Sequence, residues 1–219
     1  MFGSLSKQTY KNFELILVDT LYDKRHKEVT EYADELGIDV YHVRPNRDPN
    51  DHGFIAEARN NALPYSSGEY FMLCDDYYWL EPQVLEKHIL FQRRYGRKTI
   101  TGGAIMSYYS YPVKDEKGLI TTFGERKEER FPDSLIDERY HNTIDELFKA
   151  YNKGGEDIAV LIGGFYGIPI VNANFVVSME EMEAANGFDE RLIGHGYDDT
   201  DLLTRLNMNG NKLFIIDNA

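Results

Sequence analysis

The stretch SSGEYFMLCDDYYWLEP, residues 66–82, decides the fold. Its apolar run at 68–74 predicts a buried strand, and two adjacent acids, Asp75 and Asp76, follow the run directly. Two negative charges at the end of a buried strand are unfavourable unless something of opposite charge meets them. Ligands of doubly wound α/β sheets bind beyond the carboxyl ends of the strands. We therefore expect these carboxylates to mark a binding site.

Strands and helices alternate on both sides of this stretch. We expect strands at 12–20, 38–43, 68–74, 98–106 and 212–217, and helices at 23–37, 54–63, 82–96, 179–187 and 198–210. Such alternation predicts an α/β sheet flanked by helices. Residues 107–160 are strongly charged, with a helix expected at 134–155, and we interpret them as a variable insertion. The glycine-rich segment 163–178 is expected to be a mobile flap that leads into a strand.

Composition excludes several classes of protein. The 219 residues carry a formal net charge of -13, so neither nucleic acid nor an anionic membrane is an expected partner. One cysteine excludes an internal disulfide and fits a reducing compartment, which we expect to be the cytoplasm. No apolar run approaches the ~18 residues that a membrane span needs, and the N-terminus lacks the pattern of a signal peptide.

Four segments, in order, carry a resemblance to a known family: SLSKQTYKNFELILVDT, EARNNALPYSSGEYFMLCDD, VNANFVVSMEEMEAANGFDE and GHGYDDTDLLTRLNMNGNKL. Together they resemble the GT-A glycosyltransferases, most closely family 2, whose members are inverting and use nucleotide-sugars. The resemblance implies a Rossmann-like, mixed and mostly parallel sheet flanked by helices. It implies one domain, with a nucleotide-binding half at 1–106, the insertion at 107–160 and an acceptor-side half at 161–219.

Two parts of the family pattern are missing from the sequence. Such domains usually open with an extra strand that carries a Pro-Thr-Tyr-Asn-like segment, and here the pattern begins at the helix that follows it. Many relatives also place a His near the metal, in a region beyond Ala219. Either the sequence is an excised piece, or this member does without these parts of the donor site.

The acidic pair is expected to hold Mn²⁺ or Mg²⁺. A nucleotide-sugar diphosphate beside Asp75 and Asp76 would be repelled by about 4 kcal/mol per charge pair at ~4 Å. A hard divalent cation between carboxylate and diphosphate oxygens reverses that sign. The resemblance implies Asp76 on the metal and Asp75 on the metal's water or the ribose. Counting back from the helix instead puts Tyr77 at the metal position. A solvated turn is the alternative interpretation.

Two further residues are expected on the donor side by resemblance. Asp19, at the end of the first strand, would accept a hydrogen bond from the base, typically uracil. Its alternative is an ordinary turn or helix-capping role. Arg59 would contact the nucleotide or its phosphates, because a guanidinium suits a diphosphate. Its alternative is a structural salt bridge to Glu57 or another acid.

The segment GHGYDDTD, residues 194–201, is expected to hold the catalytic base. By resemblance, Asp199 takes the acceptor's proton, whereas Asp198, His195 and Asn174 contact the acceptor or the donor sugar. The alternative for the acids is a favourable interaction with the helix dipole. A surface pair between Asp201 and Arg205 is expected from their spacing along the helix, and Cys74 is expected to be a small apolar filler. For Trp79 we expect buried packing after the strand, and the alternative is a sugar platform formed with Tyr77 and Tyr78.

The sequence therefore predicts a metal-dependent glycosyltransferase that moves a sugar from a nucleotide donor, a UDP-sugar, to an acceptor hydroxyl with inversion. The first alternative is a non-catalytic nucleotide-sugar-binding module. The second is a nucleotidyltransferase, which normally has a glycine-rich basic loop after its first strand. The segment VDTLYDKRHK has the basic residues but no glycines, so we rank this class third. The expected partners are the donor and a glycan or glycoconjugate acceptor.

Overall fold

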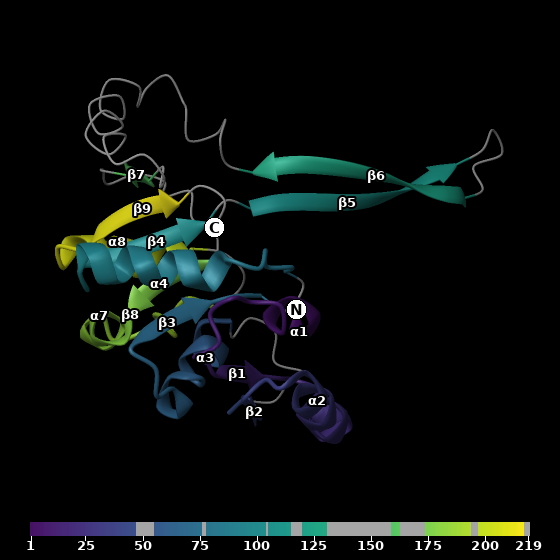
Figure 1. Cartoon of the computed structure of the whole chain (residues 1–219), viewed down its shortest axis with the longest axis horizontal. Coiled ribbons are helices and arrows are strands. Elements are labelled where there is room, and N and C mark those ends of the chain that lie inside the picture. Colours follow the sequence, from purple (N-terminus) through teal and green to yellow (C-terminus); the bar gives the residue numbers. More distant parts are fainter. Residues whose placement is uncertain are drawn as a thin grey trace.

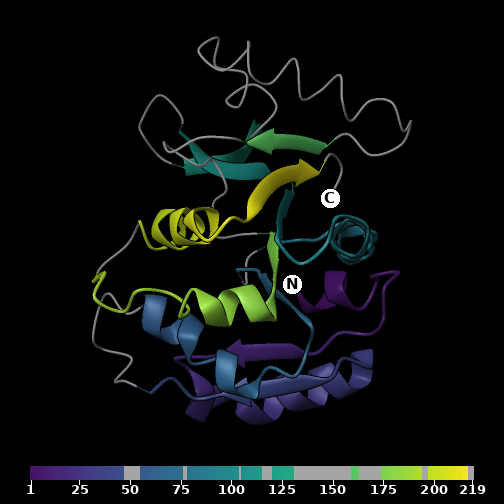
Figure 2. The same cartoon turned by 90° about the vertical axis from the view of Figure 1, so that its left-hand side faces the viewer.

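The fold is a mixed α/β arrangement with helices on both faces of a sheet. The computed structural model describes residues 1–46, 55–75, 78–103, 105–114, 120–130, 159–162, 174–193 and 197–216, and gives only the backbone for 103, 105–114, 120–130, 159–162 and 215. Its helices are α1 (Phe2–Leu5), α2 (Tyr22–Leu36), α3 (Ile55–Asn60), the short 3-10 helix η1 (Leu63–Tyr65), α4 (Val84–Tyr95), α7 (Met179–Ala184) and α8 (Asp198–Met208). In Figure 2, α4 and α8 lie on opposite sides of the sheet.

The strands fall into one larger sheet and two pairs. They are β1 (Leu15–Val18), β2 (Val40–Val43), β3 (Tyr70–Leu73), β4 (Thr99–Gly103), β5 (Ile105–Lys114), β6 (Ile120–Arg130), β7 (Ala159–Ile162), β8 (Phe175–Ser178) and β9 (Lys212–Ile216). The larger sheet has the order β3-β8-β4-β9-β7 (Figure 1). Among the described strands, β1–β2 and β4–β9 pair in parallel and the other four pairings are antiparallel. The expectation of a mostly parallel sheet is wrong in this respect, because β8 enters between β3 and β4 in the opposite direction.

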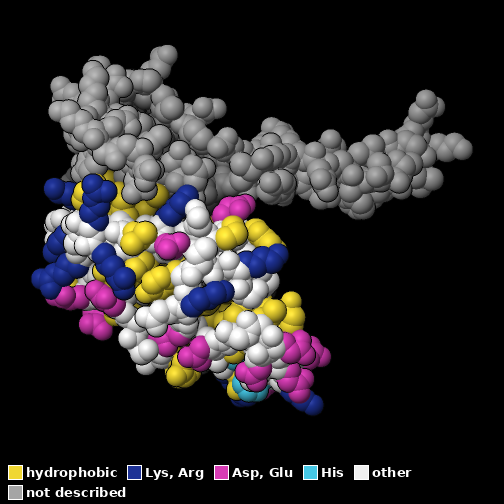
Figure 3. Space-filling view, in the orientation of Figure 1, with side chains coloured by type: hydrophobic (Ala, Val, Ile, Leu, Met, Phe, Trp, Pro, Cys, Tyr) yellow, Lys and Arg dark blue, Asp and Glu magenta, His cyan; other side chains and the backbone are white. Residues whose placement is uncertain are grey.

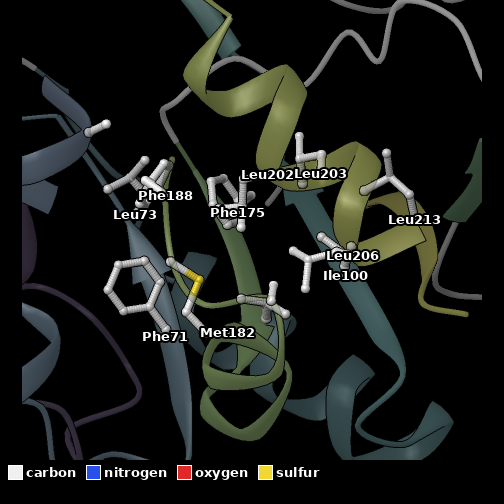
Figure 4. Packing of buried hydrophobic residues seen from close by; sticks show 13 residues of the cluster. Phe71, Leu73, Ile100, Phe175, Met182, Phe188, Leu202, Leu203, Leu206 and Leu213 are labelled. Carbon is white, nitrogen blue, oxygen red and sulfur yellow. The ribbon is translucent and has the colours of Figure 1, made fainter. Parts of the chain in front are cut away.

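The apolar face of α8 closes the main hydrophobic core. Three leucines of this helix, Leu202, Leu203 and Leu206, are fully buried against Ile100 of β4 and Phe175 of β8 (Figure 4). Their spacing places all three on one side of the helix, and the acids of its first turn lie at its N-terminal end. Burial of the three side chains thus fixes where those acids sit relative to the sheet.

The sheet is interrupted between β1 and β3. Both strands line one cavity of about 850 Å³, and no pairing joins them in the described part of the chain. Every residue of β1 is only partly buried, whereas every residue of β8, which has a strand on each side, is buried. Among the described strands, β2 is therefore the only one that pairs with β1.

The β5–β6 hairpin projects away from the rest of the protein (Figure 1). It starts at Ile105 and runs into the insertion expected at 107–160, for which we predict a helix at 134–155 and no strands. The alternation of apolar and polar residues that indicates a strand is hard to recognise there. The sequence of β6 is ITTFGERKEER, and most of these residues are charged or polar. The helix expected at 134–155 and the flap expected at 163–173 lie outside the described residues.

Charged side chains of both signs cover the surface shown in Figure 3. Acidic side chains gather at its lower end, where α2 lies in Figure 1, and this helix exposes Asp23, Glu28, Glu31, Asp34 and Glu35. None of the helices among the described residues is both long and apolar enough to cross a lipid bilayer.

The turn after α7 is anchored to α3 through Asn60. The Asn60 side chain donates to the carbonyl oxygen of Phe188 and accepts from its backbone N–H, both at 2.8 Å. Gly187 lies in this turn with a φ of 63°, and a Cβ added there would lie 2.5 Å from the Asn60 Oδ1. Gly187 is therefore required both for its backbone conformation and for its lack of a side chain.

Replacing Gly187 with Ala should lower the free energy of unfolding by about 3 kcal/mol, from left-handed strain plus the displaced Asn60 hydrogen bonds. Gly37 provides a matched control, because it has a φ of 65° and no atom within 4 Å of an added Cβ. Gly37→Ala should lower the free energy of unfolding by about 1 kcal/mol, because only the left-handed strain is added. Urea unfolding of the two variants measures the difference, and equal losses would contradict the role of Asn60.

Candidate functional site

Arg59 joins the two acidic segments that the sequence singled out. It lies on α3, and its guanidinium forms an ion pair with Asp198, at the start of α8, and approaches Asp75, after β3, at 3.6 Å. The Phe188 ring lies beneath the guanidinium at 5.4 Å. Asp75 and Asp198, which are far apart in the sequence, thus meet at the Arg59 guanidinium, beyond the carboxyl end of β3.

Burial makes this ion pair an important structural link. The side chains of Arg59 and Asp198 are 12% and 4% exposed, whereas that of Asp75 is 26% exposed. Two charges removed from water must be paired, because either one alone would carry a large desolvation cost. Asp75 is the more accessible of the two carboxylates and can meet a ligand from solvent. The salt bridge that was the alternative role for Arg59 is therefore present. Its acids are Asp198 and Asp75 and not Glu57.

Asp199, the expected base, lies one residue further along α8. It is 8% exposed, and its Oδ1 accepts a hydrogen bond from the backbone N–H of Thr200 at 2.8 Å. The Arg59 pair holds the preceding residue, so the start of the helix cannot shift without breaking a buried ion pair. The predicted pair between Asp201 and Arg205 is confirmed at 2.7 Å, and its carboxylate lies in the same first turn of α8.

Asp19 lies at the end of β1 and is almost fully engaged by its neighbours. Its carboxylate accepts two hydrogen bonds from Arg25 and one from the backbone N–H of Leu21, and lies 3.0 Å from the His42 Nε2. Burial raises the pKa of Asp19, but the bonds from Arg25, Leu21 and His42 outweigh burial, so its pKa lies below the usual value. His26 extends this hydrogen-bonded network, because its Nδ1 lies 3.1 Å from the Nδ1 of His42. A nucleotide contact by Asp19 stays a prediction.

Asn174 is held at the end of β3 by a buried polar network. Its backbone N–H donates to the Leu73 carbonyl at 2.9 Å, and its side-chain Oδ1 lies 2.8 Å from the Nε2 of His88. Because an amide oxygen only accepts, the His88 Nε2 carries the proton and its Nδ1 accepts from the Thr101 hydroxyl at 2.8 Å. Sequence reasoning missed His88, since a histidine on the apolar face of a helix gives no functional signal.

His88 should make stability depend on pH. Burial lowers its pKa from 6.5 to about 4, against a smaller opposing effect of the Asn174 hydrogen bond. The unfolded chain therefore binds more protons between these values, and the stabilising contribution is complete above pH 6.5 and is lost as pH falls towards 4. His88→Gln should remove up to about 3 kcal/mol of this dependence, measured by urea unfolding across that range.

The buried carboxylates serve as the internal reference for this measurement. Despite burial, hydrogen bonds to Asp19 and Glu181 leave the pKa of each carboxyl below its usual value, 3.8 and 4.5, so the stabilisation that each provides is lost only as pH falls below about these values. This loss should persist in the His88→Gln variant. An unchanged slope above pH 4.5 in the variant would contradict the assignment to His88.

Several expected residues lie outside the described part of the chain: Asp76, Tyr77, Gly194, His195 and Gly196. Whether Asp76 or Tyr77 holds the metal position thus stays a prediction. The described residues contain no group of three or more His, Cys, Asp or Glu that could hold a metal ion. The donor chemistry nevertheless fits Mg²⁺ or Mn²⁺, because such ions need only one or two carboxylates when substrate phosphates supply the other oxygens. Asp75 offers one such carboxylate, half-buried and open to solvent on one side.

One aromatic prediction is wrong and one apolar prediction is confirmed. Trp79 was expected to pack in the interior, but it is 61% exposed and lies beneath the ammonium group of Lys7 at 4.9 Å. Cys74 packs against a cluster of buried apolar residues, as expected for a filler side chain.

Comparison with known proteins gives matches over the whole chain. The model of "Glycosyl transferase family 2" matches residues 1–168, and that described as "N-terminal domain of galactosyltransferase" matches residues 169–219. No curated protein sequence matches. Among 84 matching chains of solved structures is the "Crystal structure of GalNAc-T7 with UDP, GalNAc and Mn2+", similar with a TM-score of 0.62 and 15% sequence identity over 97% of this chain. The alignment spans 38% of that protein's chain, and at this identity the likeness shows the fold alone.

Proposed function

Because the chain belongs to glycosyl transferase family 2, we propose that it transfers a sugar from a UDP-sugar to an acceptor hydroxyl, with a divalent cation and with inversion. Its family makes the chain a glycosyltransferase. The proposal concerns the identity of the donor, the need for a divalent cation and the inversion of the anomeric carbon. The observation that carries it is the meeting of Asp75, Arg59 and Asp198 beyond the end of β3. This arrangement supports the proposal, because it brings Asp75, the proposed donor-side acid, near the start of α8, which carries the proposed base Asp199.

The reaction requires one proton acceptor and one stabilised leaving group. Asp199 takes the proton of the acceptor hydroxyl while that oxygen bonds to the anomeric carbon. The bond from the anomeric carbon to the diphosphate breaks, and its electron pair leaves with the nucleotide. Attack from the face opposite the leaving group inverts the anomeric carbon. A positioned general base of this kind contributes about 10²- to 10⁴-fold to the rate.

The donor side is assigned to Asp75, Asp76 and Asp19. The two adjacent acids would hold Mn²⁺ or Mg²⁺, which would neutralise the diphosphate as the sugar bond breaks. Asp19 would accept a hydrogen bond from the base. The similar GalNAc-T7 structure contains UDP and Mn²⁺, which supports the choice of these two for this chain.

Nucleotide release tests the proposal. Purified protein is incubated with UDP-, GDP- and dTDP-sugars and a panel of glycan acceptors, with Mn²⁺ or with a chelator. Release of UDP that needs Mn²⁺ is the expected result. Release that the chelator leaves unchanged would overturn the metal assignment, and release only from GDP- or dTDP-sugars would overturn the choice of UDP.

A non-catalytic nucleotide-sugar-binding module is the second candidate. The burial of Asp199, which is 8% exposed, favours it, because a general base must reach the acceptor's hydroxyl group. Calorimetry with UDP and Mn²⁺ distinguishes the two candidates. Tight metal-dependent binding without release from any donor would support the module. A cytoplasmic location stays a prediction.

A further inference from the structure

Two histidines from different elements meet at their ring nitrogens beside β1. His42 lies on β2, in register with Leu17 of β1, and His26 lies in the second turn of α2. Their Nδ1 atoms are 3.1 Å apart, whereas the centroids of the two rings are 5.1 Å apart. Because the centroids are much further apart than the nitrogens, the rings meet at their edges, with the two nitrogens between them.

A carboxylate fixes the other nitrogen of the His42 ring. The Nε2 lies 3.0 Å from the Oδ2 of Asp19, and because a carboxylate only accepts, this Nε2 carries a proton. When the ring is neutral, its Nδ1 therefore presents a lone pair to His26. Arg25 and the backbone N–H of Leu21 donate to the same carboxylate and hold it in place. Histidines that bind metal ions almost always donate their second ring N–H to such a group.

Packing holds both rings in this arrangement. The Tyr22 ring lies against both imidazoles, with centroid distances of 4.5 Å to His26 and 4.8 Å to His42. The His42 side chain is 1% exposed, whereas His26 is an exposed residue. One nitrogen is thus buried and immobile, and the other belongs to a side chain that solvent and dissolved ions reach. A ligand set that is ordered in advance loses little conformational entropy when an ion binds.

We propose that His26 and His42 bind a divalent cation of the Zn²⁺ class between their Nδ1 atoms. The cation takes the place of the proton that His26 donates to His42, and His26 then carries its proton on Nε2. A cation that lies ~2.0–2.1 Å from each nitrogen holds the two ~3.3 Å apart at the tetrahedral angle, close to the 3.1 Å between them. Imidazole suits Zn²⁺, Cu²⁺ and Ni²⁺, whereas Mg²⁺ and Mn²⁺ prefer oxygen ligands. The site is therefore separate from the proposed donor-side cation and does not rest on the proposed function.

The number of protein ligands sets the expected affinity. Ordinary zinc sites have three or four protein ligands, and the described residues contain no group of three that could hold a metal ion. Water would thus complete the coordination of a cation held by two imidazoles, and we expect a Kd of about 1–100 µM. Because the two histidines lie on α2 and β2, a bound cation would link these elements and raise the melting temperature. Protons compete for the same nitrogens, so affinity should fall as the pH is lowered.

Isothermal titration calorimetry with ZnCl₂ tests the site without donor or acceptor, on tag-free protein that a chelator has stripped of metal. Wild-type protein should bind one Zn²⁺ that an excess of MgCl₂ does not displace. His26→Gln should weaken this binding at least about tenfold, since loss of even an outer partner of a metal ligand has that effect. His26 is exposed, so the variant should fold as the wild type does.

Glu31→Gln is the matched control, because it removes an exposed acid from the same helix and leaves both histidines in place. It should keep the Kd within about twofold, as for loss of a surface charge. Proton–nitrogen correlation NMR of the histidine rings adds a readout for each residue. Zn²⁺ should shift the Nδ1 signals of His26 and His42 together and leave those of buried His88 unchanged. Absence of binding, equal affinity in His26→Gln and wild type, equal losses in the two variants, or unshifted His26 and His42 signals would overturn the site.

Discussion

Replacing Asp199 with Asn should lower kcat about 10²- to 10⁴-fold, because an amide cannot take the acceptor's proton. The substitution keeps the shape of the side chain, and an amide oxygen can still accept from the Thr200 N–H that Asp199 binds at 2.8 Å. The fold should therefore persist, and KM for the donor should change little. Steady-state kinetics at saturating donor and acceptor measure the effect.

Asp201→Asn is the matched control for this variant. It removes a carboxylate from the same turn of α8, but one that pairs with Arg205 and lies outside the proposed site. We expect its kcat to stay within about threefold of wild type, as for loss of a surface pair. Near-full activity in Asp199→Asn, or equal losses in both variants, would contradict the assignment of the base.

Replacing Arg59 with Met should reduce the free energy of unfolding by about 3–5 kcal/mol, because Asp198 would lose the cation that balances its buried charge. Arg59→Lys should rescue little, since an ammonium group lacks the planar fork that reaches two carboxylates at once. Combining Arg59→Met with Asp198→Asn should recover part of the loss, because the buried charge is then absent. Urea unfolding of the single and double variants gives the coupling energy.

An exposed pair serves as the comparison for Arg59. Arg97 and Glu180 form an ion pair in which both side chains are more than half exposed. Arg97→Met should cost no more than about 1 kcal/mol, since solvent screens such pairs. If Arg59→Met and Arg97→Met destabilise equally, the Arg59 pair does not link the two acidic segments as we infer.

The strand-end acids could be predicted from the sequence because local pattern determines them. A short apolar run followed by an acid indicates a strand that ends at polar groups, and Asp19 and Asp75 lie just beyond β1 and β3. Gly37 ends α2 in the left-handed conformation, as its position after the amphipathic run predicted. These features depend on neighbours in the sequence, so one sequence suffices to find them.

Features that depend on distant neighbours could not be predicted. Arg59 and Asp198 are 139 residues apart, and nothing near Arg59 in the sequence indicates its partner. Trp79 was placed in the interior by residue type, although its position after the strand puts it on the surface. The left-handed conformation of Tyr197, with a φ of 69°, is a property of the backbone, which residue type alone does not reveal. The antiparallel entry of β8 likewise follows from the path of the whole chain.

The central claim is that this chain moves a sugar by means of Asp199 and a metal-bound donor. Proton NMR of the anomeric signals tests it most directly, in a mixture of protein, UDP-hexose, Mn²⁺ and a glycoside acceptor. We predict that the α-anomeric signal of the donor is replaced by a β-linked product signal as UDP accumulates in equal amount, and that a chelator prevents this. A donor signal that persists with every acceptor, while UDP and Mn²⁺ bind, would contradict the account.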